Sequence, residues 1–177
     1  MRKESELIGL PVISKETGKK VASIREIIYS KKKFKVVAFL INEGNIFRDA
    51  KIIRFINIDS IGKDALIIEN ENLVEKSSHF PEIDNLINEK KIIEEEILTE
   101  GGESLGHVKD IIIDVESGRI VGFILTDGLI QDLKEGRNVL PYTTETIFGE
   151  NSIIISNEAK SLFDIYKEDY KKLLELL

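Results

Sequence analysis

The sequence contains one short pattern associated with nucleophilic catalysis. From Gly102 to Gly106 it reads Gly-Glu-Ser-Leu-Gly, which matches Gly-x-Ser-x-Gly, the pattern of a hydrolase nucleophile turn. That turn needs a strand before the serine, a helix after it, and a triad histidine later in the chain. Here β-branched residues 108–113 follow instead, and no histidine comes after His107. We therefore interpret the glycines as turn positions at a strand entrance and expect no catalytic residue.

Few residues are suited to ligate a metal ion. The chain has two histidines, His79 and His107, and no cysteine, and neither histidine has a second ligand at the spacing of a zinc site. Asp127, Asp132 and Glu135 share a loop over residues 126–137, but their spacing differs from that of an EF-hand. We expect no metal, no cofactor and no enzymatic activity, and keep a small-molecule or metal-binding enzyme as an alternative.

Basic residues gather in the first part of the chain. Residues 1–72 hold 14 basic and 10 acidic side chains, although the whole chain has a net charge of −7. The run from Lys31 to Lys33 stands beside Phe34 and Lys35, a composition that can contact nucleic-acid phosphates. Lysines at a hairpin tip also protect strand edges from aggregation. A ribosome- or RNA-associated role is therefore a further alternative, with binding that weakens as salt is added.

The chain repeats itself with an offset of 84 residues. Residues 13–44 then match residues 97–128 without a gap and with 8 identities in 32 positions, and other pairs keep their apolar or charged character. The match resumes at an offset of 86, so the second copy is expected to carry two extra residues in the loop near residues 131–136. Agreement of this kind indicates an internal duplication.

Each copy is rich in short β-branched segments separated by turn residues. Strands are predicted over residues 21–29, 34–41, 50–53 and 65–69, and again over residues 105–113, 118–125, 138–141 and 152–156. Short strands at regular spacing indicate small barrels, which leave no exposed edge. We expect an all-β fold with minor α structure. Its parts are barrel copy 1 over residues 1–77, a short helical linker over 78–89, barrel copy 2 over 90–156 and a C-terminal helix over 157–177.

The last segment has the periodicity of an amphipathic helix. Its apolar stripe consists of Leu162, Phe163, Tyr166, Tyr170, Leu173, Leu174 and Leu177. The stripe packs either on its own barrel or on another chain, and we take it as the candidate partner-binding surface, with a homodimer as one outcome. No stretch has the roughly 20 apolar residues of a transmembrane helix. The absence of cysteine suits a reducing cytoplasm.

The predicted hairpins resemble the PRC-barrel family. In the second copy, residues 102–114, 117–125 and 139–142 match its pattern of a small residue and glycine, an apolar strand ending in acidic turn residues, Gly-Arg before a valine-rich strand, and a later proline-bearing strand. The first copy departs from this pattern, since Ala22 and Phe34 replace two of the glycines. Its membership rests mainly on the duplication.

This resemblance implies tandem barrels like those of the photosynthetic reaction-centre H subunit and the C-terminus of the ribosome-maturation factor RimM. In that family the barrel implies docking to other proteins, and no catalytic motif belongs to the barrel itself. No functional residue can therefore be carried over. We expect a cytoplasmic, non-enzymatic protein-interaction or assembly module with a protein partner.

Overall fold

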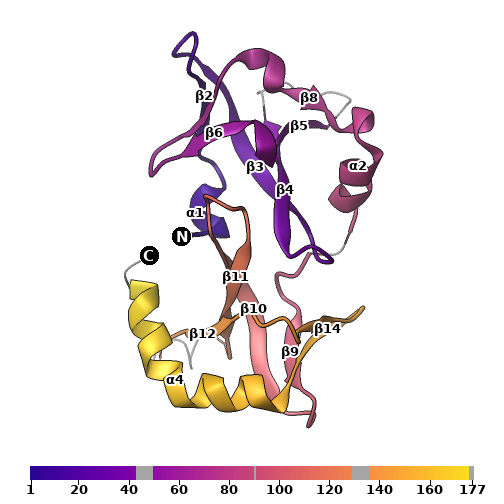
Figure 1. Ribbon diagram of the computed structural model, residues 1–177, viewed down its shortest axis with the longest axis vertical. Coiled ribbons are helices and arrows are strands. Elements are labelled where there is room, and N and C mark those ends of the chain that lie inside the picture. The colour runs from indigo at the N-terminus through magenta and orange to yellow at the C-terminus, as the bar shows by residue number, and fades with distance from the viewer. Residues whose placement is uncertain (43–49, 90, 129–135, 176–177) are drawn as a thin grey trace. The chain divides into compact units, whose positions relative to one another are not determined.

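The computed structural model describes residues 1–42, 50–89, 91–128 and 136–175 (Figure 1). The chain divides into two compact units. The N-terminal unit comprises Arg2–Glu89 together with the short segment Asp114–Arg119, and the C-terminal unit comprises Met1, Lys90–Ile113 and Ile120–Leu177.

The N-terminal unit is built on one sheet with the strand order β6-β7-β2-β3-β4-β5-β8. Its long antiparallel hairpin joins β3 (Lys20–Ser30) to β4 (Lys35–Asn42), where isoleucine, valine and phenylalanine are dense and favour strands. The other strands of this sheet are β2 (Pro11–Ser14), β5 (Lys51–Arg54), β6 (Ile58–Ile61), β7 (Leu66–Ile68) and β8 (Glu75–Lys76), and the two-residue strand β1 (Arg2–Lys3) lies outside it. The helical elements are α1 (Glu4–Leu7), α2 (Pro81–Ile87) and the 3-10 segments Phe55–Asn57, Glu71–Leu73 and Ser77–His79.

The C-terminal unit repeats this plan from β6 to β5, since its strand order, read in the same direction, is β13-β14-β9-β10-β11-β12. Its long hairpin joins β10 (Ser104–Ile113) to β11 (Ile120–Thr126). The other elements are β9 (Glu96–Thr99), β12 (Asn138–Pro141), β13 (Ile147–Phe148), β14 (Ser152–Ile155) and helix α4 (Asn157–Glu175). All eight predicted strands are present, and the expected all-β fold with minor helical content is confirmed.

The pairing registers of the two sheets agree at the positions that the sequence offsets predict. Ile13 of β2 pairs with Ile67 of the parallel strand β7, and Ile97 of β9 pairs with Ile153 of the parallel strand β14. The two pairs are related by the offsets of 84 and 86 residues. The duplication is therefore present in the backbone as well as in the residue pattern.

Irregularities in the two long hairpins also coincide. The β3–β4 register shifts between Ile24 and Glu26, and the β10–β11 register shifts between Val108 and Asp110, each 84 residues later. A second pair of shifts further along the hairpins matches in the same way. Bulges bend a strand and increase its twist, which is how a narrow sheet is made to curve toward a barrel. Both copies therefore bend at equivalent places.

The alignment of the next strand needs a correction of one residue. The offset of 86 residues sets Arg54 against Leu140. In the sheets, Ala38 pairs with Arg54, and its counterpart Gly122 pairs with Pro141. Arg54 therefore corresponds to Pro141. The chain before this strand is three residues longer in the second copy, not two, and the expected insertion near residues 131–136 falls largely outside the described residues.

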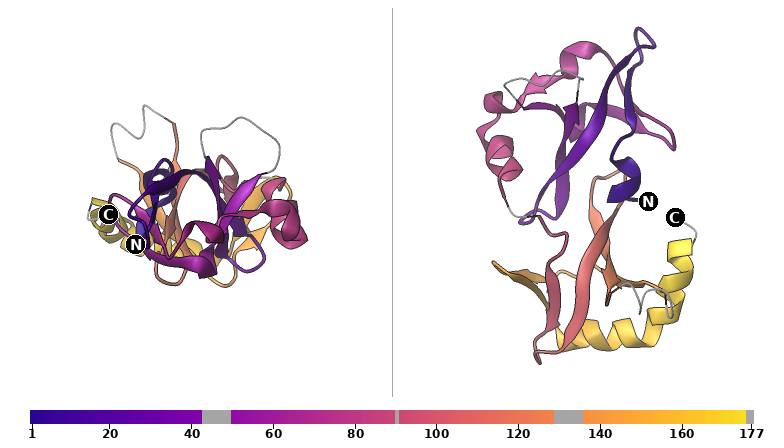
Figure 2. Two further views of the ribbon diagram at one scale, coloured as in Figure 1. Left: turned by 90° about the horizontal axis from the view of Figure 1, so that it is seen from above. Right: turned by 180° about the vertical axis from the view of Figure 1, so that it is seen from behind.

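Helix α2 packs on the sheet of the N-terminal unit (Figure 2). Ile83 is 9% exposed and lies in one apolar cluster with Ile28, Leu40 and Ile52. The Ser77 hydroxyl donates a hydrogen bond of 2.6 Å to Asp84 Oδ1 and so fixes the beginning of the helix. The segment expected to act as a linker therefore also belongs to the core of this unit.

Helix α4 covers the equivalent face of the C-terminal unit, next to β12 (Figures 1 and 2). Tyr170 packs against a buried cluster that includes Ile112 and Ile124. These two residues lie 84 positions after Ile28 and Leu40, which α2 covers. Each repeat therefore consists of a sheet and the helix that follows it.

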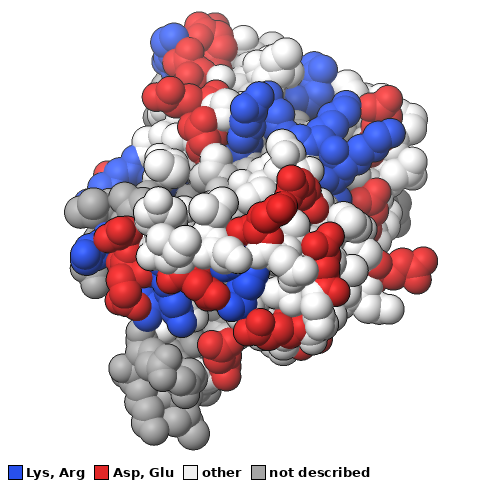
Figure 3. All heavy atoms as spheres, turned by 60° about the horizontal axis from the view of Figure 1, so that its bottom comes forward, with Lys and Arg blue, Asp and Glu red and all other residues white. Residues whose placement is uncertain are grey.

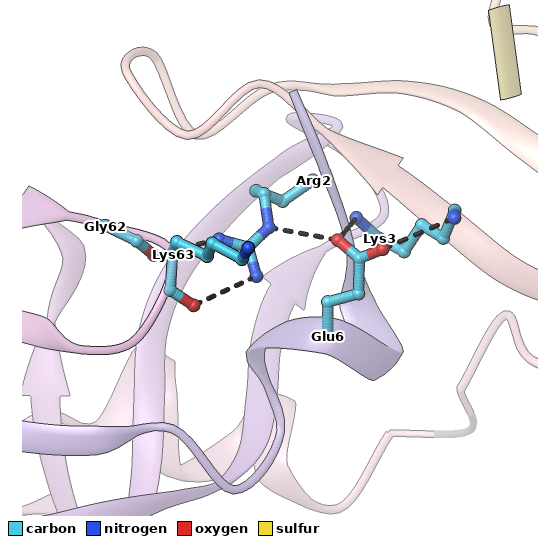
Figure 4. A network of polar contacts seen from close by, with 5 residues as sticks. All are labelled: Arg2, Lys3, Glu6, Gly62 and Lys63. Carbon is cyan, nitrogen blue, oxygen red and sulfur yellow. Dashed lines mark hydrogen bonds and ion pairs between the residues drawn. The ribbon is translucent and has the colours of Figure 1, made fainter. Parts of the chain in front are cut away.

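A small polar network holds the beginning of the chain (Figure 4). Arg2 donates hydrogen bonds to Glu6 Oε2 at 3.0 Å and to the Gly62 carbonyl at 2.8 Å, and Lys3 Nζ lies 3.3 Å from Glu6 Oε1. Partial burial pushes the pKa of Glu6 upward, but hydrogen bonds from Arg2 and Lys3 outweigh it and hold this pKa below its ordinary value. Folding therefore favours the charged form of Glu6.

We expect Glu6→Gln to lower the free energy of unfolding by roughly 0.5–1 kcal/mol at neutral pH and to have no effect in strong acid. Because the folded pKa lies below the unfolded one, the stabilisation by Glu6 is complete above the unfolded pKa. It is lost as the pH falls through the folded pKa. Urea unfolding of both proteins from neutral pH into acid measures this difference. Glu16→Gln at an exposed position is the control, and a Glu6→Gln effect that persists unchanged in acid would contradict the assignment.

Candidate functional site

The serine of the hydrolase-like pattern lies at the beginning of a strand. Ser104 is the first residue of β10, and its hydroxyl donates a hydrogen bond of 2.7 Å to Glu96 Oε1 on the neighbouring strand β9. A strand follows the serine where a nucleophile turn requires a helix. His107 lies three residues further along the same strand, and its side chain is exposed. Ser104 therefore lies in a strand that is paired with β9, and residues 104–113 form a strand where a hydrolase would have a helix.

The second glycine of this pattern has a structural role. Gly106 lies within β10 and has a φ of +102°, a region that side chains with a Cβ rarely adopt. A Cβ at this position would meet the Asp127 carboxylate and would lie 2.7 Å from the Thr126 carbonyl oxygen. Glycine is therefore required because the end of β11 approaches the backbone of β10 closely. The expectation of a turn position at the strand entrance is wrong for Gly106, which lies inside β10.

The described residues do not gather metal ligands. Within the described ranges, no group of three or more histidine, aspartate or glutamate side chains is arranged to hold a metal ion. His79 ends the 3-10 segment Ser77–His79 and is exposed. Asp127 is exposed, whereas Asp132 and Glu135 of the same predicted loop lie outside the described residues.

The basic residues of the first copy are divided between solvent and internal partners. Lys32 and Lys33 are exposed in the turn between β3 and β4. Arg54 donates to Glu75 Oε2 at 2.9 Å and lies over the Phe80 ring, 4.5 Å from its centroid. In Figure 3 the part of Figure 1 that carries β9, β14 and α4 comes forward, and basic and acidic side chains are interspersed on that face. The RNA-associated alternative stays a prediction that depends on the turn lysines.

One side of α4 is anchored to its own sheet. Ala159 and Phe163 are buried, at 7% and 5% exposed, and Tyr170 packs on the same unit. The helix begins after Ser156, whose hydroxyl accepts a hydrogen bond of 3.1 Å from the Ala159 backbone N–H. Hydrogen bonding to Asp164 raises the pKa of Lys160 against the effect of burial, and Lys160 also lies 3.5 Å from Glu103 Oε1. Phe163 and Tyr170 of the predicted stripe thus pack within the C-terminal unit.

Another side of α4 carries apolar side chains that the unit leaves in solvent. Leu162, Ile165 and Tyr166 are 52%, 70% and 46% exposed, and we call these three residues the exposed α4 face. Leu162 and Tyr166 belong to the predicted stripe, whereas Ile165 does not. The ring centroids of Tyr166 and Tyr170 lie 6.1 Å apart, so that Tyr166 on the exposed side contacts Tyr170, which packs on the sheet. The side chains of Leu173, Leu174 and Leu177, also in the stripe, are outside the described part of the chain.

Sequence reasoning missed Ile165 because it selected the widest apolar stripe. Phe163, Tyr166 and Tyr170 are separated by three and four residues and so belong to one stripe, to which Ile165 does not belong. The available signal was an isoleucine on the side of the helix that otherwise carries charges. Large apolar side chains seldom lie close together in solvent without a role, so the exposed α4 face is the candidate interaction surface of this chain.

Comparison with known proteins identifies the repeated module. The model of the PRC-barrel domain matches residues 1–73 and again residues 85–162, which together cover most of the chain. No protein in the curated set matches the sequence. Among the helices of the described ranges, none combines the length and the apolar composition needed to cross a membrane. Two matches in tandem, on sheets with equivalent registers and bulges, show that the chain belongs to the PRC-barrel family and contains two copies of its domain.

Proposed function

We propose that this chain is a non-enzymatic docking protein that binds a protein partner through the exposed α4 face. The observation that carries the proposal is the division of α4 into an anchored side and a solvent side. Ala159 and Phe163 fix the helix to its sheet, so that Leu162 and Ile165 are presented from a supported position. A surface held in place before binding loses less conformational entropy when the partner arrives.

The chemistry of this face fits protein docking. Amphipathic helices bind through apolar side chains spaced three and four residues apart, and Leu162, Ile165 and Tyr166 have these spacings. Tyrosine also supplies large contact area with few rotatable bonds. The residues around the face are both acidic and basic, as in the exposed pair Lys172–Asp169 and in the pair of exposed Glu168 with half-buried Lys171. We place the protein in the cytoplasm, as the lack of cysteine suggests.

Affinity capture with matched variants tests the proposal. The full chain is used as bait together with Leu162→Ser/Ile165→Ser and the control Ile147→Ser, which alters a side chain 58% exposed on β13. We expect the double variant to recover its specific partner at least roughly tenfold less than the wild type, since apolar contacts at an interface centre dominate binding. The control is expected to recover the partner fully. Circular dichroism checks that all three proteins are folded.

Two results would contradict the proposal. One is a wild-type bait that recovers no protein above the background of an unrelated bait. The other is a double variant that recovers the same proteins in the same amounts as the wild type, which would place docking elsewhere on the chain. Activity of the purified protein on a metabolite panel would revive the enzyme alternative.

A further inference from the structure

Two basic residues of the N-terminal unit lie opposite each other. Lys35 begins β4, and Arg119 ends the short segment Asp114–Arg119, which belongs to this unit. The two residues pair in an antiparallel bridge, and the Val36 backbone N–H donates a hydrogen bond of 2.8 Å to the Gly118 carbonyl. Because this bond flanks the bridge, Lys35 and Arg119 form a non-hydrogen-bonded pair. The side chains of such a pair lie close together, with Cβ atoms roughly 4.5–5.5 Å apart.

The opposed charges have no acidic partner. Both side chains are exposed, and within the described ranges neither forms an ion pair with an aspartate or glutamate. Asp114 of the same segment accepts hydrogen bonds from the Ser117 hydroxyl and the Glu116 N–H, so its carboxylate is engaged in its own turn. Like charges directly opposite each other in a sheet are destabilising. The pair therefore opposes folding unless an anion lies between the two side chains.

The duplication keeps a basic residue at this position and not at its neighbours. At the offset of 84 residues, the run Lys31–Lys33 corresponds to residues 115–117, which read Val-Glu-Ser and carry no positive charge. Lys35 corresponds to Arg119 itself. The two copies thus differ in charge through the rest of the turn but retain it at the one position where the two cations meet.

We infer that Lys35 and Arg119 bind a dianionic phosphate group between their side chains. A phosphate monoester carries close to two negative charges at neutral pH and has three strong acceptor oxygens, so it neutralises both cations. The Arg119 guanidinium is suited to donate two parallel hydrogen bonds to phosphate oxygens, and the Lys35 ammonium adds a point charge. This site is independent of the proposed docking function, which uses α4.

An aromatic ring restrains one of the two cations. Lys35 Nζ lies 5.8 Å from the centroid of the Phe55 ring, and this ring is half-buried and stacks on Phe39 at 6.4 Å. A cation held over a fixed ring has fewer positions open to it before binding. It therefore loses less conformational entropy when an anion arrives.

Titration of the full chain with inorganic phosphate at constant ionic strength tests the site by two-dimensional NMR. We expect saturable shifts of the amide signals around Lys35 and Arg119. Lys35→Gln and Arg119→Gln should each raise the dissociation constant at least about fivefold, because each removes one charge-assisted contact. Lys19→Gln is the matched control, since Lys19 is an exposed lysine between β2 and β3. A wild type without saturable shifts, or equal weakening by Lys19→Gln, would overturn the inference.

Two further variants separate the charge of the site from the shape of its donors. Arg119→Lys keeps the charge but loses the planar fork, so its dissociation constant should lie between those of the wild type and Arg119→Gln. Glu116→Gln removes an exposed acid from the same segment and should lower the dissociation constant. Binding by Arg119→Lys as weak as by Arg119→Gln, or weaker binding by Glu116→Gln, would contradict an electrostatic site.

Two organic phosphates test the charge of the ligand. Methyl phosphate is a monoester with nearly two charges, whereas dimethyl phosphate has one, like each phosphate of a nucleic-acid backbone. We expect methyl phosphate to bind within about twofold of inorganic phosphate and dimethyl phosphate at least about fivefold more weakly. Equal binding of the two esters would overturn the assignment to a dianion and favour a nucleic-acid backbone as the ligand.

Thermal unfolding provides a readout that a merely structural arginine would not give. Without phosphate, Arg119→Gln should melt no lower than the wild type, because the repulsion with Lys35 is removed. Addition of phosphate should raise the melting temperature of the wild type and of Lys19→Gln but not that of Arg119→Gln. A melting temperature of phosphate-free Arg119→Gln below that of the wild type would mean that the guanidinium stabilises the fold, and the inference would fail.

Discussion

Replacing Gly106 with alanine is expected to lower the free energy of unfolding by roughly 3 kcal/mol, because two unfavourable effects combine there. The φ of +102° places a Cβ in a strained region, and the added atom would meet the Thr126 carbonyl at 2.7 Å. The carbonyl belongs to the backbone of β11, which pairs with β10 and cannot retreat without breaking the ladder. Urea unfolding followed by circular dichroism measures the loss.

Gly128→Ala is the matched control for this change. Gly128 has a φ of +107°, nearly that of Gly106, but a Cβ there meets no atom of the described residues within 4 Å. Alanine at 128 should therefore lower stability only by about 1–2 kcal/mol, the part due to backbone strain. The difference between the two variants isolates the close approach of the strands. Equal losses would show that the β10–β11 contact at Gly106 is looser than the structure indicates.

Phe123→Ala and Phe39→Ala are each expected to lower the free energy of unfolding by about 3–5 kcal/mol. Both side chains are fully buried, and they occupy equivalent positions in the central strands β11 and β4, 84 residues apart. Truncation removes the ring and leaves a cavity that a closely packed sheet fills only in part. Chemical denaturation monitored by circular dichroism provides the two values, and their similarity tests whether the two copies have equivalent cores.

Leucine at the same positions serves as the control. Phe123→Leu keeps most of the buried volume and should lower stability by no more than about 1.5 kcal/mol. A loss below that value for Phe123→Ala would mean that the ring is not a central part of its core. A large loss at Phe123 with none at Phe39 would mean that the duplicated sequence no longer forms two equivalent cores.

Most of the sheet could be predicted from the sequence because its signals are local. The long hairpins stand out through dense β-branched residues on either side of turn residues, and the duplication shows them twice. The short strands β2 and β9 were not predicted. Each is four residues long and pairs in parallel with a strand distant in the chain, so nothing in its own composition marks it. Parallel pairing depends on contacts that no local window contains.

Other features depend on tertiary surroundings that the sequence pattern does not reveal. Phe34 adopts a φ of +52°, although phenylalanine disfavours this region, and its counterpart Gly118 has a φ of +74°. The glycine of the second copy thus shows that this turn position requires a positive φ. In the first copy Phe34 adopts the same conformation, and its side chain is buried. The acidic run from Glu94 to Glu96 suggests a solvated segment, yet Glu95 is only 2% exposed.

Only part of the candidate surface could be predicted from the sequence. The periodicity identifies an amphipathic helix and an apolar stripe. The residue type alone does not tell whether an apolar side chain packs on its own sheet or on another chain. The cluster around Ile112 and Ile124 decides that Tyr170 turns inward. What is left in solvent, with Ile165 at its centre, becomes visible only after that packing is known.

The helix that trails each sheet has a consequence for how the chain was assembled. A gene encoding one sheet and its trailing helix already specifies a body that shields its own apolar face. Joining two such genes end to end requires no separate connector, since the trailing helix of the first body leads directly into the second. The helix of the first body is therefore connected to folded structure at both of its ends.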